Sequence, residues 1–326
     1  MIGRFLIGNA GYKVLGGLYL GWGIGANDSA NIFGTAVATN VIRFRTAVIL
    51  IAVFVILGSV IEGPSLFDEM SFSEAASENL ALAATLAAAV TVTIITYLAI
   101  PTSTSQAAVG AFMGIAVGAS GFSAVDWSKF LTMLSCWIIN PIACVILCIV
   151  LLQVIGFLLR LVNNNSTRNR IITIGLIFFG CYGAYTLGSN NVVVTTAPYY
   201  HAGMFGEPGT AAARWAAAIG GISIAAGALT YSKRVMETIG KKITPLSPFS
   251  ALTVVMTHAL ALHFFTWIKI PVSSSQAVVG AVIGIGLYHG SRTINRKTMA
   301  RIFVGWLLTP LIAAFLAVAI ISVIGD

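Results

Sequence analysis

Long apolar stretches separated by short polar ones run through almost the whole chain. The stretches lie at 14–41, 46–62, 80–118, 128–159, 171–200, 211–230, 249–288 and 302–324. A helix needs about 20 residues to cross the hydrocarbon core of a bilayer, and these stretches are near or above that length. The pattern therefore predicts an all-α membrane protein.

Two of these stretches are too long for one crossing, and a proline divides each of them. Pro101 interrupts the third stretch and Pro271 interrupts the seventh. Proline lacks a backbone N–H and disfavours helix at the residue before it, so it ends the incoming helix. Each stretch is expected to form two helical arms joined by a polar break, either as a re-entrant hairpin or as two full spans.

The two polar breaks have nearly the same sequence. Residues 101–111 read PTSTSQAAVGA and residues 271–281 read PVSSSQAVVGA, so eight of the eleven positions are identical. A second matched pair lies upstream of the breaks, with GAND at 25–28 and GSNN at 188–191. Because the two motifs alternate along the chain, the sequence indicates an internal duplication. We place the boundary near residue 165, which divides the chain into repeats 1–165 and 166–326.

The composition agrees with burial in lipid. Hydrophobic residues make up 58% of the chain and charged residues 9%, and the mean hydropathy is +0.94, whereas a soluble domain carries roughly 25% charged residues. The net charge of +8 does not indicate nucleic-acid binding, because the basic residues do not form one stripe. They cluster between apolar stretches at Arg43/Arg45, Arg160/Arg168/Arg170, Lys233/Arg234/Lys241/Lys242 and Arg292/Arg296/Lys297/Arg301.

These clusters also predict an orientation, since basic residues favour the cytoplasmic side. If Arg43 and Arg45 lie inside, all the other basic clusters fall inside when each half makes an odd number of crossings. The two halves then have opposite topology, with broken helices or re-entrant hairpins near the midplane. Many secondary transporters are built from such inverted repeats and bind their substrate at the repeat interface.

The polar breaks supply the first candidate site. Hydroxyl residues after each proline can cap the outgoing helix, whose first N–H groups and positive dipole end then face the break. A helix start of this kind binds anions, and two facing each other suit a tetrahedral oxyanion. The alternative is that the hydroxyls serve only helix packing. The candidate ligands are Ser103, Thr104, Ser105 and Gln106 in the first break, and Ser273, Ser274, Ser275 and Gln276 in the second.

Asp28 is a carboxylate placed well inside an apolar stretch. An aspartate at the centre of a membrane helix costs about 2.5–3.5 kcal/mol on insertion scales, so a partner is expected. Asn27 and Asn31 supply neutral oxygens, which together with the carboxylate suit a hard cation such as Na⁺. Alternatively, HPO₄²⁻ could donate its O–H to Asp28, or the aspartate could simply cap a kinked helix.

Other polar residues give weaker signals. His258 and His263 are separated by about 140° around a helix, so a joint metal site is not expected; either could relay protons, although packed neutral histidines are favoured. Lys269 could attract anions, or could extend its charge to the interface. The four cysteines lie in apolar stretches without CxxC spacing, which indicates neither a metal site nor a disulfide framework. No cofactor is expected.

With these motifs, the chain resembles the PiT family of inorganic phosphate transporters. The resemblance is carried by GANDSANIFGT at 25–35, GSNNVVVTTAP at 188–198 and the two Pro-x-Ser-x-Ser-Gln breaks, and it extends over essentially the whole chain. It implies a helical inverted-repeat carrier, usually a homodimer, that couples phosphate uptake to Na⁺ or H⁺. The short loops favour a prokaryotic plasma membrane. The resemblance implies substrate ligands in both breaks and at Asn27, Asp28, Asn190 and Asn191; the cation ligands would be Asp28, Asn27, Asn31, Asn190 and Asn191.

The second half departs from the family pattern. The family usually repeats Asn-Asp there, but this chain has Asn190-Asn191, and Val194 stands where the first half has Asn31. These changes leave the number of coupled Na⁺ ions open, and they keep sulfate, which other family members carry, as an alternative to phosphate. Two other classes are a passive anion channel and a membrane-embedded enzyme such as a lipid phosphatase. The enzyme is disfavoured because the sequence has no Gly-x-Ser-x-Gly elbow, HExxH motif or acidic metal cluster.

Overall fold

The computed structural model describes residues 11–70, 77–207, 209–290 and 294–325, and within these ranges every regular element is a helix. Seven of the described helices are long and apolar enough to cross a membrane. The predicted all-α membrane fold is confirmed.

The main helices of the first half are α2 (Leu15–Asp28), α3 (Ala30–Ala38), α4 (Phe44–Ile61), α5 (Glu78–Tyr97), α6 (Thr104–Ser120) and α7 (Trp127–Arg160). Those of the second half are α8 (Asn165–Asn191), α9 (Val193–His201), α10 (Thr210–Tyr231), α12 (Pro248–Trp267), α13 (Ser274–Tyr288) and α14 (Arg296–Ile324). Shorter elements are η1 (Gly11–Val14), η2 (Gly63–Met70), η3 (Phe122–Ala124), α11 (Lys233–Glu237) and η4 (Thr238–Lys242). The interruptions expected at Pro101 and Pro271 fall between α5 and α6 and between α12 and α13.

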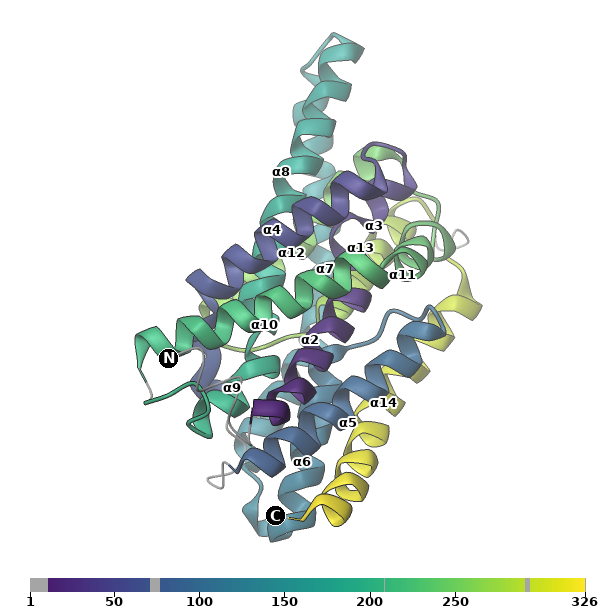
Figure 1. Cartoon of the computed structure of the whole chain (residues 1–326). Coiled ribbons are helices and arrows are strands. Elements are labelled where there is room, and N and C mark those ends of the chain that lie inside the picture. The colour runs from purple at the N-terminus through teal and green to yellow at the C-terminus, as the bar shows by residue number, and fades with distance from the viewer. Residues whose placement is uncertain (1–10, 71–76, 208, 291–293, 326) are drawn as a thin grey trace.

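The helices pack in matching pairs drawn from the two halves. Helix α2 packs on α10 while α8 packs on α4, and α6 packs on α14 while α13 packs on α7. Within each half, α5 packs on α2 and α12 packs on α8. The junction of α7 and α8 stands at the top of Figure 1 and the C-terminus at the bottom. This pairing is what a duplicated chain would give; the repeat boundary near residue 165 and the opposite topology of the halves stay predictions.

Both upstream motifs begin with a glycine at a close helix crossing. A Cβ on Gly25 would lie 1.8 Å from the Ile224 carbonyl oxygen of α10. A Cβ on Gly188 would lie 2.1 Å from the Val55 carbonyl oxygen of α4. Any side chain would therefore push these helices apart, and small residues at such crossings let membrane helices approach closely.

The same motifs end their helices at the same place. Asp28 is the last residue of α2 and Asn191 is the last residue of α8. Only Ser29 separates α2 from α3, and its hydroxyl donates to the Gly25 carbonyl oxygen. Only Val192 separates α8 from α9. The motif side chains therefore project from interruptions in two long apolar helices, at the centre of the bundle.

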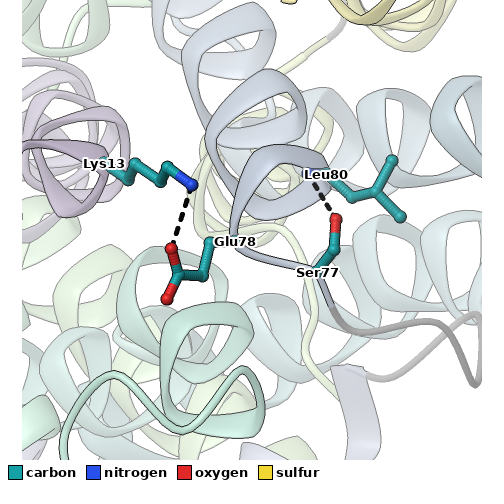
Figure 2. A network of polar contacts seen from close by, with 4 residues as sticks. All are labelled: Lys13, Ser77, Glu78 and Leu80. Atoms are coloured by element: carbon teal, nitrogen blue, oxygen red, sulfur yellow. Dashed lines mark hydrogen bonds and ion pairs between the residues drawn. The ribbon is translucent and has the colours of Figure 1, made fainter. Parts of the chain in front are cut away.

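An ion pair joins the beginning of the described chain to α5. Lys13 Nζ lies 2.9 Å from Glu78 Oε2, and the neighbouring Ser77 hydroxyl caps α5 by accepting the Leu80 N–H at 3.2 Å (Figure 2). Both charged side chains are partly exposed, so the pair contributes at most about 1 kcal/mol. It fixes the start of α5 without taking part in the central site described next.

Candidate functional site

Each polar break ends in a capped helix start. Ser103 is the N-cap of α6, and its hydroxyl accepts the Gln106 N–H at 3.3 Å. Ser273 is the N-cap of α13, and its hydroxyl accepts the Gln276 N–H at 3.2 Å. Because both caps are buried, two helix N-termini with their partial positive charge lie inside the protein.

The two breaks contact each other. The Ser105 hydroxyl donates to the Val272 carbonyl oxygen at 3.0 Å, and the Ser275 hydroxyl donates to the Thr102 carbonyl oxygen. All four residues are buried. Residues 167 and 173 positions apart in the sequence are therefore brought into contact, and the two helix starts belong to a single site.

Asn27 and Asn190 hold the two breaks in the same way. Asn27 Oδ1 accepts the N–H of Thr102, the residue after Pro101, at 3.1 Å, and Asn190 Oδ1 accepts the N–H of Val272, the residue after Pro271, at 3.2 Å. Both side-chain amides also donate to a threonine hydroxyl, in Thr96 at 2.9 Å and in Thr266 at 3.0 Å. These two asparagines are therefore engaged in positioning the breaks.

Asp28 lies where the two breaks meet. Its Oδ2 accepts a hydrogen bond from the Thr104 hydroxyl of the first break at 2.6 Å. Its Oδ1 accepts from Asn31 Nδ2 at 3.4 Å and lies 3.2 Å from the Ser275 hydroxyl of the second break, which can give its one hydrogen to Asp28 or to the Thr102 carbonyl oxygen. The carboxylate is 1% exposed, and donors from both halves replace the water that it has lost.

Asn31 extends this cluster towards α12. Its Nδ2 donates to Ser274 Oγ at 2.9 Å, and His258 Nε2 of α12 lies 2.8 Å from the same oxygen. His258 is fully buried. Sequence reasoning favoured a packed neutral histidine at this position, and its contact with a predicted anion ligand was not anticipated.

Several buried oxygens near these motifs have no partner among the described residues. Those of the predicted set are Asn31 Oδ1, Asn191 Oδ1, Gln106 Oε1 and Gln276 Oε1. The Asn191 side-chain amide donates to the Leu187 carbonyl oxygen at 3.2 Å, so the structure does not join Asn191 to the Asp28 cluster through a hydrogen bond. Unpaired buried acceptors are uncommon in folded proteins, and neutral oxygens of this kind are ligands for hard cations.

Two further residues support the breaks and were missed in the sequence. Asn140 Nδ2 of α7 donates to the Ser273 carbonyl oxygen at 3.0 Å, and the Thr309 hydroxyl of α14 lies 2.8 Å from the Thr102 hydroxyl. Each precedes a proline inside its helix, Pro141 or Pro310. This polar-proline pair at corresponding places in the two halves is the signal that could have identified them.

Lys269 lies apart from the Asp28 cluster. Its side chain is exposed at the tip of the second break, where it lines a cavity of about 240 Å³ together with Asp126 and Lys129. His263 packs against the Tyr182 ring, with ring centroids 5.4 Å apart. Neither residue has a hydrogen bond to the capped helix starts among the described contacts.

The chemistry of this site follows from its donors and its single carboxylate. Hydroxyls and helix N-termini from both halves can bind an oxyanion, while Asp28 and neighbouring amide oxygens can bind a hard cation. Among the described residues, no group of three or more His, Cys, Asp or Glu side chains is placed to hold a metal. The geometry fits a hydroxyl-lined site for an anion, with one carboxylate that can bind a cation beside it.

The chain is similar in sequence and in fold to known phosphate transporters. The sequence profile of the phosphate transporter family matches residues 24–317. A Pyrococcus furiosus protein that carries the name phosphate permease is 27% identical, over 91% of each chain. A Bacillus subtilis protein named as a low-affinity inorganic phosphate transporter is 25% identical, over 90% of each chain. A solved structure described as a sodium-dependent phosphate transporter has the same fold, with a TM-score of 0.85, 22% identity, and coverage of 96% of this chain and 98% of that one.

Proposed function

Because the chain belongs to the phosphate transporter family, we propose that it is a secondary active transporter that carries inorganic phosphate across the plasma membrane together with Na⁺ or H⁺. The family is one of transport proteins and not of enzymes. The apolar helices make the chain a multi-pass integral membrane protein.

The proposal depends on one observation, the convergence of two capped helix starts on Asp28. Thr104 reaches the carboxylate from the first break and Ser275 reaches it from the second. Phosphate would bind between the two helix starts, where N–H groups and hydroxyls replace its hydration shell. Oxygens that point in several directions suit a tetrahedral anion approached from two sides.

A cation at Asp28 would balance the charge of the site. A bare carboxylate beside an anion is repulsive, and the repulsion is strong where water is excluded. Na⁺ bound to Asp28 with the free Asn31 oxygen, or a proton on the carboxyl group, would remove this repulsion. The name of the structural neighbour favours Na⁺. This chain has Asn191 where a second carboxylate is usual in the family, so fewer coupled charges are expected.

Alternating access would arise from movement of the two halves about this site. The pairing of α2 with α10 and of α8 with α4 joins the halves symmetrically, and inverted repeats of this kind exchange their conformations when a transporter opens to the other side. The hydrogen bonds from Ser105 to Val272 and from Ser275 to Thr102 join the two breaks. They would have to rearrange for phosphate to enter or leave.

Uptake into proteoliposomes tests the proposal. Purified protein should accumulate labelled phosphate above its external concentration when a Na⁺ or H⁺ gradient is imposed, and should not do so without one. The two gradients, applied separately, identify the coupling ion. Equilibration without accumulation would instead show a passive channel, and accumulation of labelled sulfate without phosphate would reassign the substrate.

A further inference from the structure

His258 raises a question that its burial alone does not answer. Its Nε2 lies 2.8 Å from Ser274 Oγ, while its Nδ1 is buried and has no partner among the described residues. Ser274 Oγ also accepts a hydrogen bond from Asn31 Nδ2 at 2.9 Å. The hydrogen of neutral His258 can lie on Nδ1 or on Nε2. Its position decides whether the Ser274 hydroxyl hydrogen is available to a ligand.

The two tautomers of neutral His258 have different consequences. With the hydrogen on Nδ1, a buried N–H would lack an acceptor, and orphaned buried N–H groups are rare. With the hydrogen on Nε2, His258 donates to Ser274 Oγ, and only a lone pair at Nδ1 stays unpaired. We therefore assign the Nε2–H tautomer. Ser274 Oγ then accepts from both His258 and Asn31, which occupies both of its acceptor positions.

A serine oxygen with both acceptor positions filled keeps its own hydrogen for another acceptor. Resting on the proposed function, we propose that His258 is a positioning residue for phosphate binding. By donating to Ser274, it turns the Ser274 hydroxyl into an obligate donor to an oxygen of the bound anion. His258 itself does not touch the substrate.

The first half has no equivalent arrangement. Thr104 occupies the position that corresponds to Ser274, but its hydroxyl hydrogen is given to Asp28 Oδ2 at 2.6 Å. Ser105 gives its hydrogen to the Val272 carbonyl oxygen, and Ser275 gives its hydrogen to the Thr102 carbonyl oxygen or to Asp28. The Ser274 hydroxyl differs from the other three, because in the described contacts its hydrogen is not used and can be donated to a ligand. The second half, which lacks the carboxylate, would therefore supply the donor, and the first half the charge.

A double-mutant cycle of uptake kinetics tests this proposal. His258→Leu removes the donor and should raise the KM for phosphate about tenfold, the loss expected for one hydrogen bond to a charged group, with a smaller change in the maximal rate. Ser274→Ala should raise KM to a similar extent. Because His258 acts through Ser274, the double variant should be no worse than Ser274→Ala alone.

A conservative variant separates positioning from other roles. His258→Gln places an amide N–H near the position of Nε2 and should restore a KM within about threefold of the original protein, because the donor is restored. His263→Leu on the same helix is the matched control and should leave KM unchanged. If His258→Leu yields no folded protein, His258→Phe, which also lacks the N–H donor, takes its place in the cycle with Ser274→Ala.

Other outcomes would overturn the proposal. A roughly hundredfold rise in KM for the double variant would mean that the two residues act independently. Loss of uptake in His258→Gln with folding intact would assign His258 a proton-carrying role, because an amide cannot titrate. Failure of the original protein to accumulate phosphate would reject the proposed function itself, which is a separate result.

Discussion

The side chain of Asn27 holds the backbone of Thr102, because its Oδ1 accepts the Thr102 N–H at 3.1 Å directly after Pro101. A break in a membrane helix leaves backbone groups that lipid cannot satisfy, so protein groups must bind them. Asn190 does the same for Val272 after Pro271. The asparagines of the two motifs thus make polar breaks possible inside the bilayer.

Replacing Asn27 or Asn190 with alanine should destabilise the protein by about 1–3 kcal/mol. Either change leaves a buried backbone N–H without an acceptor, and uptake should fall because the helix start is no longer held in place. Thermal unfolding in detergent measures the first effect. Ser135→Ala removes only an exposed hydroxyl bonded to the Leu131 carbonyl oxygen and should stay within about 0.5 kcal/mol of the original protein. Equal stability of the asparagine variants and this control would contradict the assigned role.

Asp28→Asn should reduce phosphate uptake by about a hundredfold, a loss within the range expected when one member of a buried, hydrogen-bonded charge pair is removed. The amide removes the charge that would hold the coupling cation, and it can place an NH₂ group against the donors Thr104 and Asn31. Asp126→Asn is the matched control, since Asp126 caps α7 by accepting the Lys129 N–H at 2.9 Å and asparagine caps equally well. Uptake that survives Asp28→Asn would remove this carboxylate from the mechanism.

Gly25→Ala and Gly188→Ala should each disrupt packing between the halves. The new Cβ would meet a backbone carbonyl oxygen at 1.8 Å in the first case and 2.1 Å in the second, and backbone cannot move aside as a flexible side chain can. Low yield and aggregation in size-exclusion chromatography are expected. Gly156→Ala in α7 is the control, because its Cβ would lie 3.5 Å from the Phe249 ring; it should be neutral or slightly stabilising. Normal assembly of both tight variants would mean that the helices tolerate a wider separation.

Ala99→Gly together with Lys269→Gly should stabilise the protein by about 1 kcal/mol. These residues lie two positions after the ends of α5 and α12 and have φ angles of 55° and 60°, a left-handed conformation that glycine adopts without strain. The gain should appear as a raised unfolding temperature. Ala143→Gly, on the exposed face inside α7, should have the opposite sign and cost about 1 kcal/mol. A lowered unfolding temperature for the double variant would show that other contacts at these turns dominate.

Much of the fold could be read from the sequence. The outer ends of the apolar stretches lie within six residues of the observed helix ends, because the length and hydrophobicity that a membrane helix needs depend on local sequence. The helix ends at Asp28 and Asn191, inside two of these stretches, were not predicted. The position of Ser103 and Ser273 after the prolines likewise indicated the capped helix starts, since capping depends on neighbouring residues alone.

The partners of the polar side chains could not be read in this way. Nothing in the local sequence indicates that Asn27 is engaged by the Thr102 break, that Asn140 reaches Ser273, or that His258 lies against Ser274. These contacts join residues 75, 133 and 16 positions apart. Hydrogen-bond partners depend on which helices pack side by side, and apolar helix surfaces in lipid look alike in sequence.

The sequence by itself determined a duplicated, membrane-spanning chain with two capped helix starts and one buried carboxylate, because each of these follows from residue type and short-range order. Only the tertiary structure decided that both helix starts meet at Asp28, that the asparagines serve largely to hold the breaks, and that Ser274 is set apart from its counterpart Thr104. Those outcomes depend on distances between separate helices, which are fixed by close packing and by the need to pair every polar group removed from water.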